Sequence, residues 1–436
     1  MWTLMKHPVF GRLFGAQVVA LLGTGLLTVA LGLLAFDLAG AAAGAVLGTA
    51  YAIKMVAYVG LSPVAGALVA NLPRKPVLIM ADLVRAAVAL SLPFISEVWQ
   101  IYLAIFLLQT ASATFTPAYQ ATIPDVLEDE DDYARALSLS RLAYDLENLI
   151  SPALAGLLLL MISYHWLFGG TVIGFAFSAF LIWGTLLPAR QRTKDRPFRT
   201  RLTRGVRIYL ATPRLRGLLA LTLTAAAASA FVIVNTVVVV RSGFGGTDGD
   251  VAIALAAFGG GSMIAALALP AMLKRLSDRP VMLTGAALLT VLMALQAFIT
   301  VNWPVFLALW ALLGLGYSAT LTPQGRLLRR SAHAEDRQAI FTAQFALSHV
   351  CWLFTYPLAG NAMNAWGMGP TLGILAVVGA IGLTAALRLW PVGDPVIVTH
   401  SHDDLPDNHP HLAGGGHRHA HALVIDDEHH AWPTQG

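Results

Sequence analysis

The sequence predicts an all-α integral membrane protein with twelve transmembrane helices in two six-helix bundles, followed by a disordered, histidine-rich tail. Three observations predict this class. Hydrophobic residues make up 57% of the 436 residues and charged residues only 12%, which is too few charges to coat a soluble domain of this size. Apolar stretches of roughly 20 residues, the length that crosses a bilayer, recur along the chain. Lys and Arg gather in alternate connections between these stretches.

Twelve apolar stretches supply the expected helices. Helices are the expected spanning element, because a chain in lipid must satisfy its own backbone hydrogen bonds and no β-barrel alternation is present. The first stretch is too long for the apolar core of a cleavable signal peptide, so we expect it to be retained as a helix. The stretches cover residues 10–36, 45–70, 77–95, 99–122, 135–162, 164–188, 217–240, 249–273, 280–300, 304–322, 338–361 and 368–390.

The basic residues predict the orientation of these helices. One set of connections carries Arg74, Lys75, Arg135, the block 190–216, Lys274, Arg275, Arg279, Arg326, Arg329, Arg330 and Arg337. The opposite connections carry only Arg241. Because cytoplasmic loops are enriched in Lys and Arg, both termini are expected in the cytoplasm.

The chain divides into four regions. Residues 190–216 hold ten Lys or Arg and a single acid, Asp195, and should form a linker on the membrane surface. This linker separates a first bundle, 1–189, from a second bundle, 217–391, and the tail follows at 392–436. A faint repeat supports the division, since Phe-Thr-Pro ends the fourth stretch at 115–117 and Leu-Thr-Pro ends the tenth at 321–323.

Several motifs carry a family resemblance. The connection Gly66-Ala-Leu-Val-Ala-Asn-Leu-Pro-Arg-Lys75 is similar to the Gly-x-x-x-Asp-Arg-x-Gly-Arg-Arg loop of the major facilitator superfamily, with Ala70, Asn71 and Pro73 as departures. The resemblance covers about residues 5–390. Residues 115–124 resemble the branch with enterobactin exporters and macrolide efflux proteins, and residues 138–147 and 343–353, with the tail, look like its nickel-resistance exporters. This implies a bacterial inner-membrane exporter that works by alternating access.

The fifth stretch carries charges near mid-membrane. If its helix begins near Ala134, Asp145 lies roughly 16 Å along it, with Arg141 and Asn148 on the same face and Glu147 on another. Charges at this depth are costly and usually mark an ion path. We therefore predict that Asp145 and Glu147 bind cation and proton alternately. The alternative is a static Arg141–Asp145 pair that locks helices together.

The eleventh stretch carries His349, with Gln344 about one turn earlier. An imidazole combined with carboxylates suits nickel, cobalt or zinc, and it can also carry a proton near neutral pH. We predict that His349 supplies a nitrogen ligand, the alternative being a histidine hydrogen-bonded within the bundle. Lys54, in the second stretch, either neutralises an acid in the pathway or extends toward the outer surface.

Two further pairs are candidates for gating. Asp82 and Arg85 are three residues apart near the start of the third stretch, so they can pair on one helix face as a structural or gating pair. Arg74 and Lys75 remain from the basic end of the family-like loop and are assigned to the gate by the resemblance.

The tail holds nine of the 13 histidines, interleaved with acids. Alternate residues of an extended chain project to one side, so each His-x-His can chelate one ion. Imidazole and carboxylate without thiolate favour borderline divalent metals. We therefore predict metal binding by His400, His402, His409, His411, His417, His419, His421, His429 and His430, the alternative being a pH-responsive polar tail.

Other functions find little support. The single cysteine, Cys351, excludes a disulfide framework and Cys-based metal centres, and neither a phosphate-binding glycine loop nor a hydrolase triad is present, so no enzyme is expected. The sequence predicts a monomeric, proton-coupled exporter of nickel or cobalt, with no resident cofactor and with the bilayer and a small cation as its partners, not nucleic acid. Multidrug, macrolide or siderophore efflux is the second hypothesis, and a membrane-anchored metal sensor or store is the third.

Overall fold

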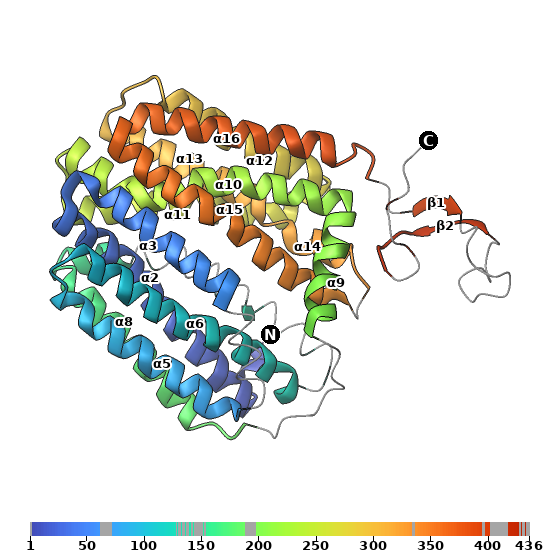
Figure 1. Ribbon diagram of the computed structural model, residues 1–436, viewed down its shortest axis with the longest axis horizontal. Coiled ribbons are helices and arrows are strands. Elements are labelled where there is room, and N and C mark those ends of the chain that lie inside the picture. The colour runs from blue at the N-terminus through green and yellow to red at the C-terminus, as the bar shows by residue number, and fades with distance from the viewer. Residues whose placement is uncertain are drawn as a thin grey trace.

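The structure is a computed structural model. It describes residues 2–61, 72–127, 129, 132, 136, 139–140, 143, 151, 154–187, 198–333, 336–394, 397–401, 417–426, 429 and 432. Long helices dominate it, and they form two groups that follow each other in the chain (Figure 1).

The first helix group runs from the N-terminus to Trp183. Its longest helix begins where the His7 side chain accepts a hydrogen bond from the Phe10 amide and Pro8 occupies the first turn, a position that suits proline. It ends at Gly40, whose φ of +54° lets the chain reverse. The elements are α1 (Trp2–Met5), α2 (Pro8–Ala39), η1 (Gly40–Ala42), α3 (Ala43–Val56), η2 (Ala57–Leu61), α5 (Arg74–Ser91), η3 (Leu92–Phe94), α6 (Val98–Val126) and α8 (His165–Trp183).

The second helix group follows helix α9 (Phe198–Ala211), which lies in the predicted linker. Thr247 and Asp250 cap one of its helices reciprocally, and Asn302 caps another through its side-chain oxygen, as expected for helix starts. The elements are α10 (Pro213–Val238), η4 (Val239–Gly243), α11 (Asp248–Met272), α12 (Asp278–Gln296), α13 (Trp303–Leu321), α14 (Gln324–Arg329), α15 (Arg337–Trp366) and α16 (Met368–Leu389).

Eleven of the twelve predicted stretches coincide with helices where they are described, the second of them over residues 45–61 only, and half of the fifth falls outside the described residues. Among the residues that the structure describes, nine segments are long and apolar enough to cross a membrane, and the first, Pro8–Leu61, contains both α2 and α3. The all-helical membrane architecture is therefore confirmed, while the count of twelve stays a prediction.

The two helix groups meet most closely along α3 and α15 (Figure 1). Glycines permit this contact: a Cβ added to Gly48 would lie 2.6 Å from the Tyr356 carbonyl oxygen, and one added to Gly360 would collide with the Gly44 backbone. Small residues commonly let helix backbones approach in membranes. We call the end of the molecule with Gly40 and Gly360 the far end, and the end with α9 the linker end.

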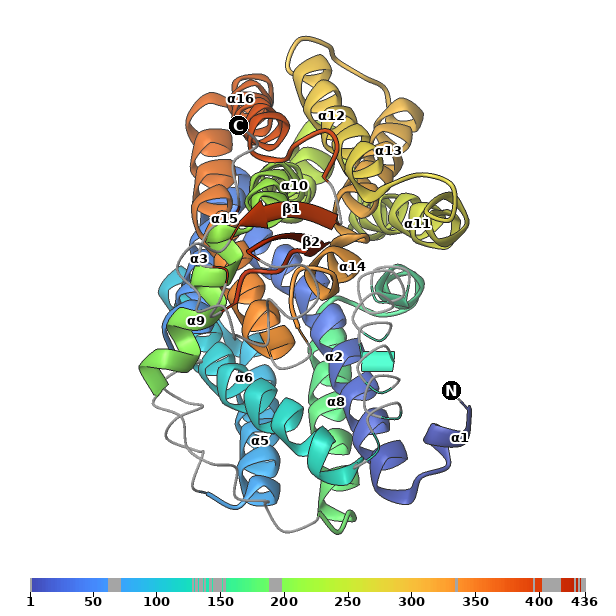
Figure 2. The same cartoon turned by 90° about the vertical axis from the view of Figure 1, so that its right-hand side faces the viewer.

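The tail differs from the predicted disordered segment in its described part. Strands β1 (Ile397–Ser401) and β2 (Arg418–Ala422) pair antiparallel, and Leu423, Val424 and Ile425 after them are buried. Apolar burial explains the difference, because these three consecutive residues bury apolar surface and Ile425 does so within a cluster of the second helix group. The strand pair lies at the linker end in both views (Figures 1 and 2).

The glycine contact makes a testable prediction. Replacing Gly360 with alanine should destabilise the protein by about 1–3 kcal/mol, the usual cost of overpacking, because the new methyl group meets the Gly44 backbone. Thermal unfolding in detergent measures this. Gly32→Ala is the matched control, since a Cβ there meets no atom within 4 Å; equal melting temperatures for the two variants would show that the contact is not tight.

Candidate functional site

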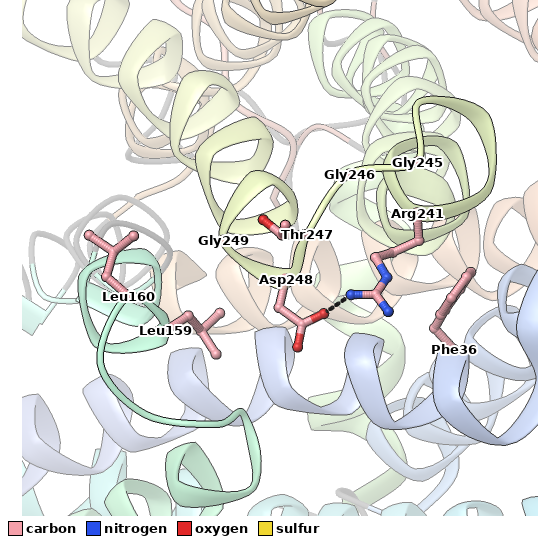
Figure 3. A pocket seen from close by; sticks show the side chains of 9 residues that line it. All are labelled: Phe36, Leu159, Leu160, Arg241, Gly245, Gly246, Thr247, Asp248 and Gly249. Atoms are coloured by element: carbon pink, nitrogen blue, oxygen red, sulfur yellow. Dashed lines mark hydrogen bonds and ion pairs between the residues drawn. The ribbon is translucent and has the colours of Figure 1, made fainter.

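A cluster at the far end joins the two helix groups. Arg241, the one basic residue predicted on the outer side, pairs with Asp248, and its guanidinium lies 5.3 Å from the centre of the Phe36 ring in α2 (Figure 3). A pocket of about 650 Å³ opens beside this pair, lined by both helix groups. Because cation–π attraction and packing act across the boundary between the groups, this cluster closes the far end together with the glycine contact.

Further along the same boundary, Lys54 of α3 and His349 of α15 come together around Tyr58. The Lys54 ammonium lies 5.6 Å from the centre of the Tyr58 ring, and the His349 ring meets Tyr58 edge-on at 5.4 Å between centroids. Lys54 is ten residues beyond Gly44, or roughly 15 Å along the helix, which places the cluster near mid-membrane. Two residues predicted separately from the sequence therefore share one site.

Hydrogen bonding fixes the state of the His349 ring. Its Nδ1 lies 2.6 Å from the Phe345 carbonyl oxygen. A carbonyl oxygen can only accept, so Nδ1 carries a proton, and in the neutral ring Nε2 keeps its lone pair. A histidine oriented in this way, by a carbonyl on one nitrogen, has the other nitrogen ready to bind a metal ion or a proton.

Aromatic rings surround this imidazole. The Phe345 ring lies 4.0 Å from the His349 ring and the Trp352 ring 6.0 Å from it, centre to centre. Tyr51, on the other side of Lys54, packs against Tyr356 at 5.1 Å. Tyr58 was not among the sequence candidates, although its position four residues after Lys54 puts it on the same helix face.

Gln344 lies apart from this cluster. Its side-chain oxygen accepts a hydrogen bond from the Tyr209 hydroxyl of α9, and its amide nitrogen donates to Gln324 at 3.5 Å. Burial raises the pKa of Tyr209 well above its usual value, so the hydroxyl keeps the proton that it donates. In this structure Gln344 attaches the linker helix to α15.

Asp82 and Arg85 form a buried ion pair on α5, with 0% and 6% of their surfaces exposed. The Ser178 hydroxyl donates to Asp82 at 2.7 Å, and the guanidinium stacks on Phe115 and Phe175 at 4.2 and 4.5 Å from the ring centres. These contacts link α5, α6 and α8 within the first helix group. The geometry favours the structural reading of the predicted pair.

The predicted gate residue Arg74 pairs with Asp125 at the end of α6, and Lys75 follows it on α5. The second helix group holds a similar pair with the charges exchanged, because Asp278 at the start of α12 lies 3.3 Å from Arg326 of α14. Arg329 and Arg330 line a pocket of about 420 Å³ beside that pair. Each helix group therefore carries one ion pair between corresponding connections. The sequence analysis did not predict Asp125, because its partner Arg74 is far away in sequence.

Several predicted residues cannot be placed. Asp145, Glu147, Asn148 and Arg141 lie outside the described residues, as do four tail histidines, namely His402, His409, His411 and His430. His417, His419 and His429 are within the described part, whereas His400 and His421 are described by their backbone in the strands alone. Among the side chains that are described, no three His, Cys, Asp or Glu residues come close enough to hold a metal ion.

Comparisons with known proteins agree with this architecture. Residues 13–240 and 217–412 match the family description "Major Facilitator Superfamily". Two curated relatives are similar over part of the chain: the uncharacterized transporter YfiS of Bacillus subtilis, 29% identical over 28% of this chain and 29% of its own length, and Macrolide efflux protein A of Streptococcus pyogenes, 28% identical over 34% and 37%. The chain thus spans about a third of the length of these relatives.

Solved transporter structures share the fold. The nucleoside transporter NupG superposes with a TM-score of 0.63 at 14% identity, covering 87% of this chain and 98% of that one. An inward-facing, unoccupied bacterial homologue of the human lysosomal transporter Spinster gives 0.66 at 14% identity, covering 87% and 96%. At these identities the likeness concerns the fold alone.

The buried ion pair generates a prediction. Asp82→Ala should destabilise the protein by about 3–5 kcal/mol, because Arg85 is left charged and buried. The double variant Asp82→Leu with Arg85→Met should be markedly more stable than the single variant, since no charge is stranded. Chemical unfolding in detergent compares the two. A single variant as stable as the wild type would contradict a structural role.

Proposed function

Because this chain belongs to the major facilitator superfamily, we propose that it is a secondary transporter that exports divalent nickel or cobalt across the bacterial inner membrane in exchange for protons. The chain is a multi-pass membrane transporter of that superfamily. The substrate, the direction and the coupling ion are the proposal, and each is supported by separate features of the molecule.

The orientation rests on the distribution of charge. The linker end carries Lys274, Arg275, Arg279, Arg326, Arg329 and Arg330, whereas the far end carries Arg241. By the positive-inside rule, the linker end is cytoplasmic. The helix groups are in contact at the far end through the glycines and through Arg241 on Phe36, which supports a proposed route from the site at His349 toward the cytoplasm.

The observation that carries the cation proposal is the state of His349. Its Nδ1 is committed to the Phe345 carbonyl, which leaves Nε2 as a nitrogen ligand at the boundary that must rearrange during transport. Neutral imidazole is a favoured ligand of nickel and cobalt. The histidine-bearing strands at the linker end support the same substrate, because they can raise the local metal concentration beside the cytoplasmic opening.

Charge balance explains why carboxylates are needed at this site. A divalent cation beside the Lys54 ammonium is strongly repelled in a medium of low dielectric constant. Asp145 and Glu147, the predicted mid-membrane acids, provide the compensating charge when ionised. When they take up protons from the outer side the cation loses its ligands, so proton entry and cation release are coupled. Rocking of the helix groups about the α3–α15 boundary then closes the linker end and opens the far end.

Efflux of an organic compound is the second candidate function. Five aromatic residues gather at the same boundary, namely Tyr51, Tyr58, Phe345, Trp352 and Tyr356. Aromatic side chains with a few polar groups are typical of sites for organic ligands. The relative named Macrolide efflux protein A is compatible with this reading.

The acid at position 145 provides a direct test of the mechanism. Asp145→Asn should abolish nickel resistance in a sensitive host, because an amide can neither compensate the cation nor carry the proton. Immunoblots of membrane fractions check that the variant reaches the membrane. Asp129→Asn, which alters an exposed acid of a connecting loop, is the control and should retain resistance. Full resistance of the Asp145 variant would remove this residue from the mechanism.

The substrate class is tested by growth on graded plates of nickel, cobalt, zinc and a macrolide, with and without the gene. The cation proposal expects at least a several-fold rise in the tolerated nickel or cobalt concentration and no change for the macrolide. The reverse pattern would establish the organic efflux function instead. A chain that lacks residues 392–436 should retain part of its resistance, and complete loss would favour a metal sensor.

A further inference from the structure

The end of the tail is seated on the linker end of the second helix group. Ile425, with 0% of its surface exposed, shares an apolar cluster with Tyr209 of α9, Leu215 of α10 and Leu327 of α14. Trp432 packs against the same cluster. We call residues 423–426 with His429 and Trp432 the strap, and strands β1 and β2 the ribbon. The strap thereby belongs to the same apolar cluster as the helix that joins the two helix groups.

Arg214 of α10 holds the chain on both sides of the ribbon. Its guanidinium donates to Asp394, three residues before β1, at 3.3 Å, and to the carbonyl oxygen of Leu423, directly after β2, at 3.5 Å. It also lies 4.9 Å from the centre of the Trp432 ring. Only 2% of the surface of Arg214 is exposed, so this residue is a buried contact between α10 and the tail and not a surface charge.

Asp394 strengthens the anchor at the point where the chain enters the ribbon. Its carboxylate also pairs with Arg330, and its φ of +28° is a backbone conformation that residues other than glycine rarely adopt. Such a conformation persists where the surroundings hold it in place. Two arginines of the helix bundle therefore fix the point at which the tail enters the ribbon.

Asp426 holds the strap, which follows β2, in place. Its carboxylate lies 3.3 Å from Nε2 of His333, in the connection after α14, and 2.9 Å from Nδ1 of His429 within the strap. The His429 amide donates to the same carboxylate at 2.7 Å. The strap is thus held by apolar burial, by Arg214 and by an acid between two imidazoles.

The ribbon between these anchors places histidines opposite one another. In the antiparallel register His400 pairs with His419, and Val398 pairs with His421. Directly opposite residues of such a pair have Cβ atoms about 4.5–5.5 Å apart, and residues two apart on a strand share a face. Positions 400, 419 and 421 therefore belong to one face, an arrangement that suits a borderline divalent cation.

We propose that the ribbon is a divalent-cation site whose affinity is coupled to docking of the strap through Arg214. The proposal rests on the proposed binding of divalent cations by this protein. Because Arg214 holds the chain both where it enters the ribbon, at Asp394, and where it leaves the ribbon, at Leu423, docking lowers the entropic cost of keeping the two strands paired and positions 400 and 419 together. By thermodynamic reciprocity, a bound cation tightens the strap on α9 by the same factor. Occupancy of the ribbon by a cation thereby changes how tightly the strap packs in the apolar cluster that contains α9.

The first test is a calorimetric titration of the full-length protein in detergent with NiCl2. The tail component of binding is the part that disappears in the double variant His400→Ala with His419→Ala. Arg214→Gln should weaken this component about tenfold, within the usual range of such couplings, although the residue touches no histidine of the ribbon. Arg216→Gln, two residues later on the same helix, is the matched control and should bind as the wild type does.

The second test measures docking directly by hydrogen–deuterium exchange. NiCl2 should slow amide exchange over residues 423–432 in the wild type and leave it unchanged in the His400/His419 double variant. Trp432→Ala serves as a second undocking variant if Arg214→Gln elutes as an aggregate in gel filtration. Wild-type nickel affinity in an undocked variant, or absence of a tail component, would overturn the proposal. Growth on nickel plates reports on export separately, so failure of the coupling and failure of the exporter are distinguishable.

Discussion

The close contact between α3 and α15 is the constraint on which the rest of the structure depends. Two helices from different halves of the chain can touch backbone to backbone only because Gly48 of α3 and Gly360 of α15 have no side chain at the contact. Lipid supplies no hydrophobic force that drives helices together, so packing of this kind must hold the halves. The contact closes the far end, and it sets the register that brings Lys54 and Tyr58 against His349.

The charged residues within the bundle separate into two kinds. Asp82 and Arg85 pair with each other inside the first helix group, and their contacts with Ser178 and with two aromatic rings all lie within that group. Lys54 and His349 lie on opposite sides of a boundary that alternating access must open. Charge in a membrane is costly wherever it lies, so in the proposed mechanism it is position relative to that boundary that separates the structural pair from the proposed transport residues.

Local sequence patterns predicted the helices well. Hydropathy alone located eleven stretches that the structure confirms as helices, and the basic block located the linker that holds α9. The site was predicted residue by residue but not as a cluster: Lys54 and His349 lie far apart in sequence, and no short-range pattern shows their meeting through Tyr58. Gln344 was predicted as a pathway residue because it lies about one turn from His349, and the structure adds a hydrogen bond to it from the Tyr209 hydroxyl of the linker helix. The seated tail was missed, since its stability comes from Arg214 and the apolar cluster and not from its own composition.

The most direct measurement of the central claim is the distance between the halves at the far end. Spin labels at Ala41 and Asn361, two exposed positions beside the glycine contact, on a Cys351→Ala background, report it by double electron–electron resonance. If α3 and α15 are the boundary that opens during transport, nickel with an imposed proton gradient will add a second population at longer distance. A single distance that stays the same under all conditions, in a protein that still transports, would contradict the account.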